Sequence, residues 1–85
     1  MLNFTRQIQS DGQLLEFSFL RILTANGPKY FVMVPGSYRE YHFIIEKLEG
    51  EWVINDAPRV PEWVHELEGT LVKAIVENEA LARLD

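Results

Sequence analysis

The chain has 85 residues, a formal net charge of −5 and a hydrophobic fraction of 47%. This length and composition fit one globular domain, and the absence of cysteine excludes disulfides, thiolate catalysis and cysteine metal sites. Residues 1–47 hold five basic and four acidic side chains, whereas residues 48–85 hold three basic and nine acidic ones, the reverse of a typical nucleic-acid-binding surface. The first residues do not resemble a signal peptide, and no apolar stretch approaches the ~20 residues of a membrane span. We therefore expect a soluble, cytoplasmic protein.

Turn signals divide the first two thirds of the chain into strand-like runs. They are "SDGQ", "NGP", "PGS" and "EGE", and the runs between them are rich in β-branched and aromatic residues. The pattern predicts an α+β fold, in which a five-stranded antiparallel β-meander over about 2–55 precedes one C-terminal α-helix packed across one face. The expected strands lie near residues 2–9, 14–23, 29–34, 40–48 and 51–55.

The turns also predict how the strands pair. Asp-Gly and Asn-Gly are strong signals for two-residue hairpin turns, because such turns need positive φ angles. We therefore place turns at Asp11-Gly12, Asn26-Gly27 and Glu49-Gly50. The resulting pairs are Phe4 with Phe19, Arg6 with Phe17, Ile8 with Leu15, Leu20 with Met33, Ile22 with Phe31, Ile45 with Ile54, and Lys47 with Trp52.

These pairings create a conflict in the second strand. Phe17 and Phe19 point to one face of a regular strand, whereas Leu20 and Ile22 point to the other, so one face cannot bury both sets. Either a β-bulge lies near Phe19–Arg21, or both faces of the sheet are partly covered.

The segment "DAPRVPEW" joins the last strand to the helix. Each proline pushes the residue before it, Ala57 and Val60, toward an extended conformation, which predicts a stiff joint over 56–61. The alternative is a PxxP ligand formed by Pro58 and Pro61, but the second proline begins a helix, and this favours the scaffold interpretation. Trp52 and Trp63, on either side of the joint, should both be largely buried.

An apolar stripe predicts a helix over about 61–83. Its positions recur at helical spacing, and charged or polar side chains occupy the opposite side, which should face water. Gly69 is a weak position inside this helix. The stripe is Val64, Leu67, Leu71 and Ile75, widened by Trp63, Val72 and Ala74, and the polar side is Glu66, Thr70, Lys73 and Glu77.

Two histidines are the candidates for acid–base or metal chemistry. Glu40, His42 and Glu46 share one strand face, and His65 lies on a helix flank with Glu62 or Glu68. Ile44 interrupts the first group, so we favour a solvent-facing polar row, and for His65 a hydrated helix flank. No hydrolase, zinc-protease or phosphate-loop motif is present in the sequence. We predict no enzyme, with no catalytic, cofactor-binding or metal residues.

A set of aromatic and basic residues indicates a second kind of site. The order of strands followed by one helix is similar to single-stranded-DNA-binding transcriptional coactivators, whose sheet can stack bases. The alternative is that the rings fill the core of a small domain. The set is Tyr30, Phe31, Tyr38, Tyr41 and Phe43 with Arg21, Lys29 and Arg39.

The last third of the chain resembles small uncharacterised bacterial proteins that have a strand meander and a closing helix. The resemblance lies in "WVINDAPRVPEWVHELEGTLVKAI" and implies a fold but no site. It is carried by Trp52, Ile54, Pro58, Pro61, Trp63, Leu67 and Leu71.

The preferred function is a non-enzymatic protein-interaction module. The alternatives are a small-molecule-binding domain and a weak single-stranded nucleic-acid binder that uses the strand surface. With the helix on one face, the other face should expose apolar residues, which favours a homodimer through the outer sheet face over a monomer. Those residues are Leu14, Ile44, Leu48 and Val53, joined in the absence of a bulge by Leu20, Ile22, Phe31 and Met33.

Overall fold

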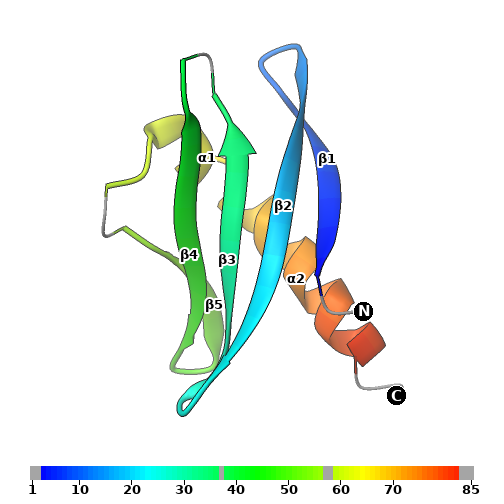
Figure 1. Cartoon of the computed structure of the whole chain (residues 1–85), viewed down its shortest axis with the longest axis vertical. Coiled ribbons are helices and arrows are strands. Elements are labelled where there is room, and N and C mark those ends of the chain that lie inside the picture. The colour runs from blue at the N-terminus through cyan, green and yellow to red at the C-terminus, as the bar shows by residue number, and fades with distance from the viewer. Residues whose placement is uncertain (1–2, 37, 57–58, 83–85) are drawn as a thin grey trace.

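The computed structural model describes residues 3–36, 38–56 and 59–82, in which a single antiparallel sheet precedes two helices (Figure 1). The strand order β1-β2-β3-β4-β5 follows the chain, as the turn signals predict. Leu2, Ala57, Pro58 and Arg83, which belong to the predicted first strand, joint and helix, lie outside the described residues. The elements are β1 (Phe4–Ser10), β2 (Gln13–Thr24), β3 (Gly27–Pro35), β4 (Glu40–Leu48), β5 (Glu51–Asn55), α1 (Glu62–His65) and α2 (Glu68–Ala82).

The first and last hairpins have the predicted turns and registers. Asp11 and Glu49 adopt positive φ angles of 48° and 51°, and each precedes a glycine that also has a positive φ. Two successive positive φ angles match the twist of the strands that such turns join. The predicted pairings in these two hairpins, from Phe4 with Phe19 to Lys47 with Trp52, are confirmed.

The predicted register of the middle hairpin is wrong by two residues. Ile22 pairs with Lys29 and Leu20 with Phe31, because the turn is formed by Ala25 and Asn26 and not by Asn26 and Gly27. A turn at Asn26-Gly27 would need the amide of residue 28 to close it, and Pro28 has none. The Thr24 hydroxyl also stabilises the earlier turn, since it donates to the Gly27 carbonyl at 2.6 Å.

The second strand contains no bulge. Its pairing with β1 runs without interruption from Gln13 to Phe19, and its pairing with β3 from Ser18 to Thr24, so the two apolar sets of β2 lie on opposite faces of the sheet. We call the side toward the helices the inner face and the other side the outer face. The inner face carries Phe17, Phe19, Tyr30, Val32, Val34, Phe43, Ile45 and Ile54, and the outer face carries Ser18, Leu20, Ile22, Lys29, Phe31, Met33, His42, Ile44, Glu46 and Val53.

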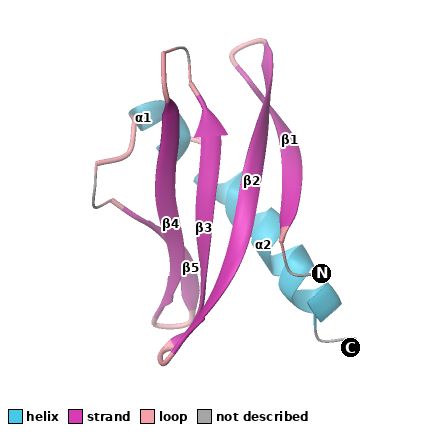
Figure 2. Ribbon diagram, in the orientation of Figure 1, coloured by secondary structure: helices cyan, strands magenta, loops and turns pink. Residues whose placement is uncertain are grey.

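Helix α2 crosses the inner face obliquely, and both helices lie on that one side of the sheet (Figure 2). Near its start, the Glu68 carboxylate accepts a hydrogen bond of 2.9 Å from the Ile54 amide of β5. Near its end, Glu79 contacts Arg21 of β2. The predicted stripe is confirmed: Val64, Leu71, Ala74 and Ile75 are buried and Leu67 is partly buried, whereas Glu66, Thr70, Lys73 and Glu77 are exposed.

The predicted single helix is interrupted at Glu66 and Leu67. There the Leu67 amide donates to the carbonyl three residues back, that of Val64, at 2.9 Å, which tightens the turn. Pro61 caps α1 with φ −58° and ψ 149°, so the first helical residue is Glu62. The interruption lets a one-turn α1 pack at one end of the sheet and α2 across it.

Aromatic rings pack against one another within the sheet and, at one contact, between the sheet and α1. Phe4 and Phe19 stack with their centroids 4.4 Å apart, and Trp52 meets Tyr30 edge to face at 5.6 Å. Trp63 of α1 packs in the same way on Tyr41 at 6.0 Å. Both tryptophans were predicted to be largely buried; they pack against the core and are partly buried. Of the described helices, neither is long and apolar enough to cross a membrane.

Candidate interaction surface

The outer face of the sheet is uncovered in the described chain, and Figure 1 looks directly onto it. Three of its large apolar side chains are nevertheless exposed: Leu20 is 46% exposed, Phe31 41% and Ile22 36%. They lie on neighbouring strands, since Leu20 pairs with Phe31 and Phe31 pairs with Ile44. Adjacent exposed apolar side chains of this size commonly mark a binding surface.

A shallow hollow of about 420 Å³ lies at one side of this face. Its apolar lining is larger than its polar lining, and the polar groups come from Asn3, Thr5, Ser18 and His42. A volume of this order falls within the range of ~300–1,000 Å³ that small-molecule sites occupy. The apolar lining residues are Phe4, Phe19, Leu20, Phe31 and Met33.

The three residues of β4 that were considered as a cluster, Glu40, His42 and Glu46, are not joined by one set of contacts. The His42 Nε2 atom lies 3.5 Å from a carboxylate oxygen of Glu40, and both side chains are more than half exposed. Glu46 contacts other residues: it pairs with Lys29 at 3.3 Å and accepts a hydrogen bond of 2.8 Å from the side-chain amide of Asn55. The row therefore holds one exposed His–Glu pair at one end and one Lys–Glu pair at the other.

The second histidine contacts the joint and not the helix carboxylates considered for it. The His65 Nε2 atom lies 3.0 Å from Asp56 Oδ1, and the same oxygen accepts a hydrogen bond of 2.7 Å from the Val60 amide. These hydrogen bonds, first that from Val60 and then that with His65, lower the pKa of Asp56. Val60 is buried, whereas Asp56 and Arg59 are exposed, so the joint is anchored in the core at Val60, which supports its scaffold role.

The predicted stacking set is divided between the two faces. Tyr30 and Phe43 are buried on the inner face, and Tyr41 packs there against Trp63. Phe31 lies on the outer face, and Tyr38 is fully exposed in the segment between β3 and β4. The structure therefore does not bring these rings together as one platform.

The basic residues of that set are also separated. Arg21 forms an ion pair under the helix with Glu79, and Lys29 forms one on the outer face with Glu46. The Arg39 guanidinium lies over the Tyr41 ring, 5.0 Å from its centroid.

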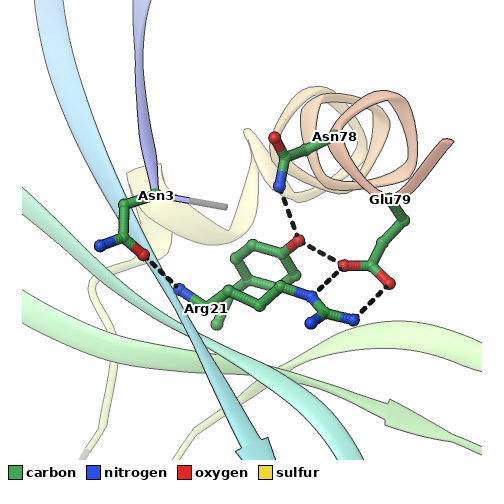
Figure 3. A network of polar contacts seen from close by, with 5 residues as sticks. Asn3, Arg21, Asn78 and Glu79 are labelled. Carbon is green, nitrogen blue, oxygen red and sulfur yellow. Dashed lines mark hydrogen bonds and ion pairs between the residues drawn. The ribbon is translucent and has the colours of Figure 1, made fainter. Parts of the chain in front are cut away.

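A polar network beneath α2 was not predicted from the sequence (Figure 3). The Glu79 carboxylate accepts hydrogen bonds from Arg21 Nε at 2.6 Å and Nη2 at 3.1 Å, and from the Tyr30 hydroxyl at 2.5 Å. The Asn78 amide donates to the same hydroxyl at 2.9 Å. Next to it, Asn3 accepts a hydrogen bond of 3.2 Å from the Arg21 amide. The network joins the end of the helix to β2 and β3.

The network keeps Tyr30 in its neutral form. Burial of the phenol, followed by its hydrogen bond to Glu79, raises the pKa of Tyr30 to about 12. The hydrogen bond to Glu79 likewise raises the pKa of Arg21. A signal for this network exists in the sequence: Arg21 shares the strand face of Phe17 and Phe19, and Asn78 continues the helical spacing of Leu71 and Ile75.

No family model matches the chain, and neither a curated protein nor a solved structure matches it significantly. The resemblance to small bacterial proteins with a meander and a closing helix therefore stays a prediction.

Proposed function

We propose that the chain is a non-enzymatic protein-interaction module whose contact surface is the outer face of the sheet. The observation that carries the proposal is the exposed row of Leu20 and Phe31, beside the half-buried Ile44. An apolar centre surrounded by polar side chains is the usual arrangement of a protein interface. The proposal includes a cytoplasmic setting, with which the cysteine-free composition agrees.

Site-specific photo-crosslinking in cells tests this proposal. A photoreactive amino acid at Leu20 should give one discrete protein adduct, which mass spectrometry can identify, including an adduct with the chain itself. The matched control places the same amino acid at Val76, an exposed apolar position of α2 on the other side of the molecule. Equal adducts from both positions, or none from Leu20, would contradict the proposal.

A second candidate function is the binding of a small, mainly apolar molecule in the hollow next to Leu20. Its apolar lining, to which the outer-face residues Leu20, Phe31 and Met33 contribute, and its few polar groups support it. A ligand with a concentration 100 times its dissociation constant would stabilise the protein by about 2.7 kcal/mol, which a thermal-shift screen detects. Replacing Ser18 by Trp would fill the hollow, and it should abolish the shift of any ligand found.

A further inference from the structure

We propose that the outer face binds the outer face of a second copy of this chain, so that the protein is a two-fold symmetric homodimer. This inference rests on the proposed function and names the partner of the same surface. It follows from the arrangement of the outer face, from its charges and from its size.

Side chains on the outer face are arranged in rows across the strands. The middle row is apolar at its centre and polar at its two ends, because Leu20, Phe31 and Ile44 lie between Asn3 and Asn55. An apolar centre with a polar margin can pack against an identical surface without burying unpaired polar groups. The rows on either side are Ser18, Met33 and His42, and Ile22, Lys29, Glu46 and Val53.

The charges of these rows allow two copies to approach. The whole chain carries −5, but Lys29 and Glu46 neutralise each other at 3.3 Å on this face. Three further carboxylates of the outer face, those of Glu16, Glu40 and Glu51, are exposed and lie outside these three rows. The three central rows therefore carry one positive and one negative side chain, and repulsion between two copies is small where these rows meet.

Two orientations of the two-fold axis are available to sheets packed face to face with aligned strands. An axis across the strands, along the middle row, sets Phe31 against Phe31 and Ile44 against Ile44 of the second copy. It also sets His42 against Glu46 of the second copy and Met33 against the aliphatic part of Lys29. No two like charges of these three rows then oppose each other.

The other axis runs along β3 and is less favourable. It sets Lys29 against Lys29 of the second copy, and it sets Ile22 against the Glu46 carboxylate. Opposed like charges at an interface are costly, and so is a carboxylate against an apolar side chain. The charges of the outer face therefore select the axis that runs across the strands.

The size of the face also suits a dimer. The five strands hold 42 residues in all, which at ~3.3 Å per residue and ~4.8 Å between strands span roughly 670 Å². A stable interface of ordinary size buries about 800 Å² per partner. The outer face alone is thus nearly large enough, without a contribution from the helices.

Light scattering on the purified full chain gives the first test. At about 100 µM, where a dimer with a micromolar dissociation constant is almost complete, we expect twice the chain mass of 9.9 kDa. Phe31→Ser should weaken association at least tenfold and leave the circular dichroism spectrum unchanged, because Phe31 is partly exposed. Leu81→Ser, at an exposed position of α2, is the matched control and should leave the dimer intact. A monomer at this concentration, or a Phe31→Ser variant that dissociates at the same concentration as the wild type in a dilution series, would overturn the inference.

Single cysteines test the axis, since the chain has none of its own. With the axis across the strands, Ile44→Cys lies against its own copy and should be cross-linked by a short bismaleimide. Met33→Cys lies on a different row from its copy and should not be. Efficient cross-linking through Met33→Cys without Ile44→Cys would show the other axis and contradict the geometry.

Failure of the dimer and failure of the proposed function give different results. If the purified chain is monomeric but Leu20 still gives an adduct with another protein in cells, the surface binds a different partner and the homodimer is excluded. If neither assay shows contact at the outer face, both the proposed interaction surface and the homodimer are wrong.

Discussion

The phenol hydroxyl of Tyr30 on β3 donates a hydrogen bond of 2.5 Å to the carboxylate of Glu79 on α2, although 49 residues separate the two in the chain. Arg21 of β2 shares the same carboxylate through two nitrogen atoms. This contact holds the last turns of the helix against the sheet, at the opposite end from the joint.

Glu79→Ala should destabilise the protein by about 2–4 kcal/mol, because it removes three hydrogen bonds and leaves the Arg21 guanidinium beneath the helix without its carboxylate partner. Urea unfolding measures the difference. Glu77→Ala is the control on the same helix, and it should cost less than about 0.5 kcal/mol, because the ion pair of Glu77 with Arg6 is exposed. Equal effects of the two variants would disprove the role of the network.

Tyr30 should ionise near pH 12, later than an ordinary tyrosine with a pKa of 10.0. Since its folded pKa is raised, the stability it contributes is complete below pH 10 and decreases as the pH rises through the folded value. In a pH titration followed by phenolate absorbance, the wild type should show a late step near pH 12 that is missing in Tyr30→Phe. An unchanged late step in that variant would show that Tyr30 is not the group that titrates there.

Asp56→Asn should loosen the joint at neutral pH and have no effect in strong acid. The pKa of Asp56 is lowered from 3.8, so its contribution to stability is complete above 3.8 and is lost as the pH falls through the lower folded value. Urea unfolding of the wild type and of the variant at several pH values should show curves that converge below about pH 3.8. A difference that stays constant across this range would rule out the titration of Asp56.

Two glycines should respond in opposite directions to alanine. A Cβ atom on Gly36 would lie 2.5 Å from the Tyr41 ring and 2.7 Å from the Arg39 carbonyl, and this overpacking should cost about 1–3 kcal/mol. Gly69 has open space around it in α2, so Gly69→Ala should raise stability by up to about 1 kcal/mol. Melting temperatures measured side by side decide this, and shifts of the same sign would be inconsistent with the geometry.

Short single-stranded oligonucleotides should not bind measurably at ~150 mM salt, because such binding depends on the neutralisation of phosphates by free basic groups. Arg21 and Lys29 already pair with carboxylates, and the chain carries −5. Fluorescence anisotropy provides the measurement. Micromolar binding that weakens with salt would contradict this prediction and favour the single-stranded nucleic-acid binder.

Local sequence signals correctly predicted the strands, the first and last hairpins and the buried stripe of the helix. Asp11-Gly12 and Glu49-Gly50 fix their hairpins because each turn depends on its own two residues. The predicted register of the middle hairpin was wrong, because Pro28 has no backbone amide to close the turn that Asn26-Gly27 would otherwise form.

The polar network and the hollow could not be read from local signals. The network joins Arg21 to Glu79, which meet only once the helix crosses the sheet. The hollow is lined mainly by residues of β1 to β4, and it forms only when these strands pair. Face parity placed Arg21 on the inner side, but the oblique path of α2 decides which helix residue it meets. The apolar residues of the outer face, in contrast, follow from the alternation of side chains along each strand. The sequence therefore predicted them as one of two alternatives, the other being a bulge in the second strand.

The order of the strands has a consequence for how the chain folds. Paired residues in the sheet are close in sequence, with Lys29 and Glu46 among the most distant, whereas Arg21 and Glu79 lie 58 residues apart. Short loops close first, because the entropic cost of closure grows with their length. We expect the hairpins to assemble in the transition state and the helix to dock after it. Weakening the contact between Arg21 and Glu79 should then accelerate unfolding while leaving the refolding rate nearly unchanged.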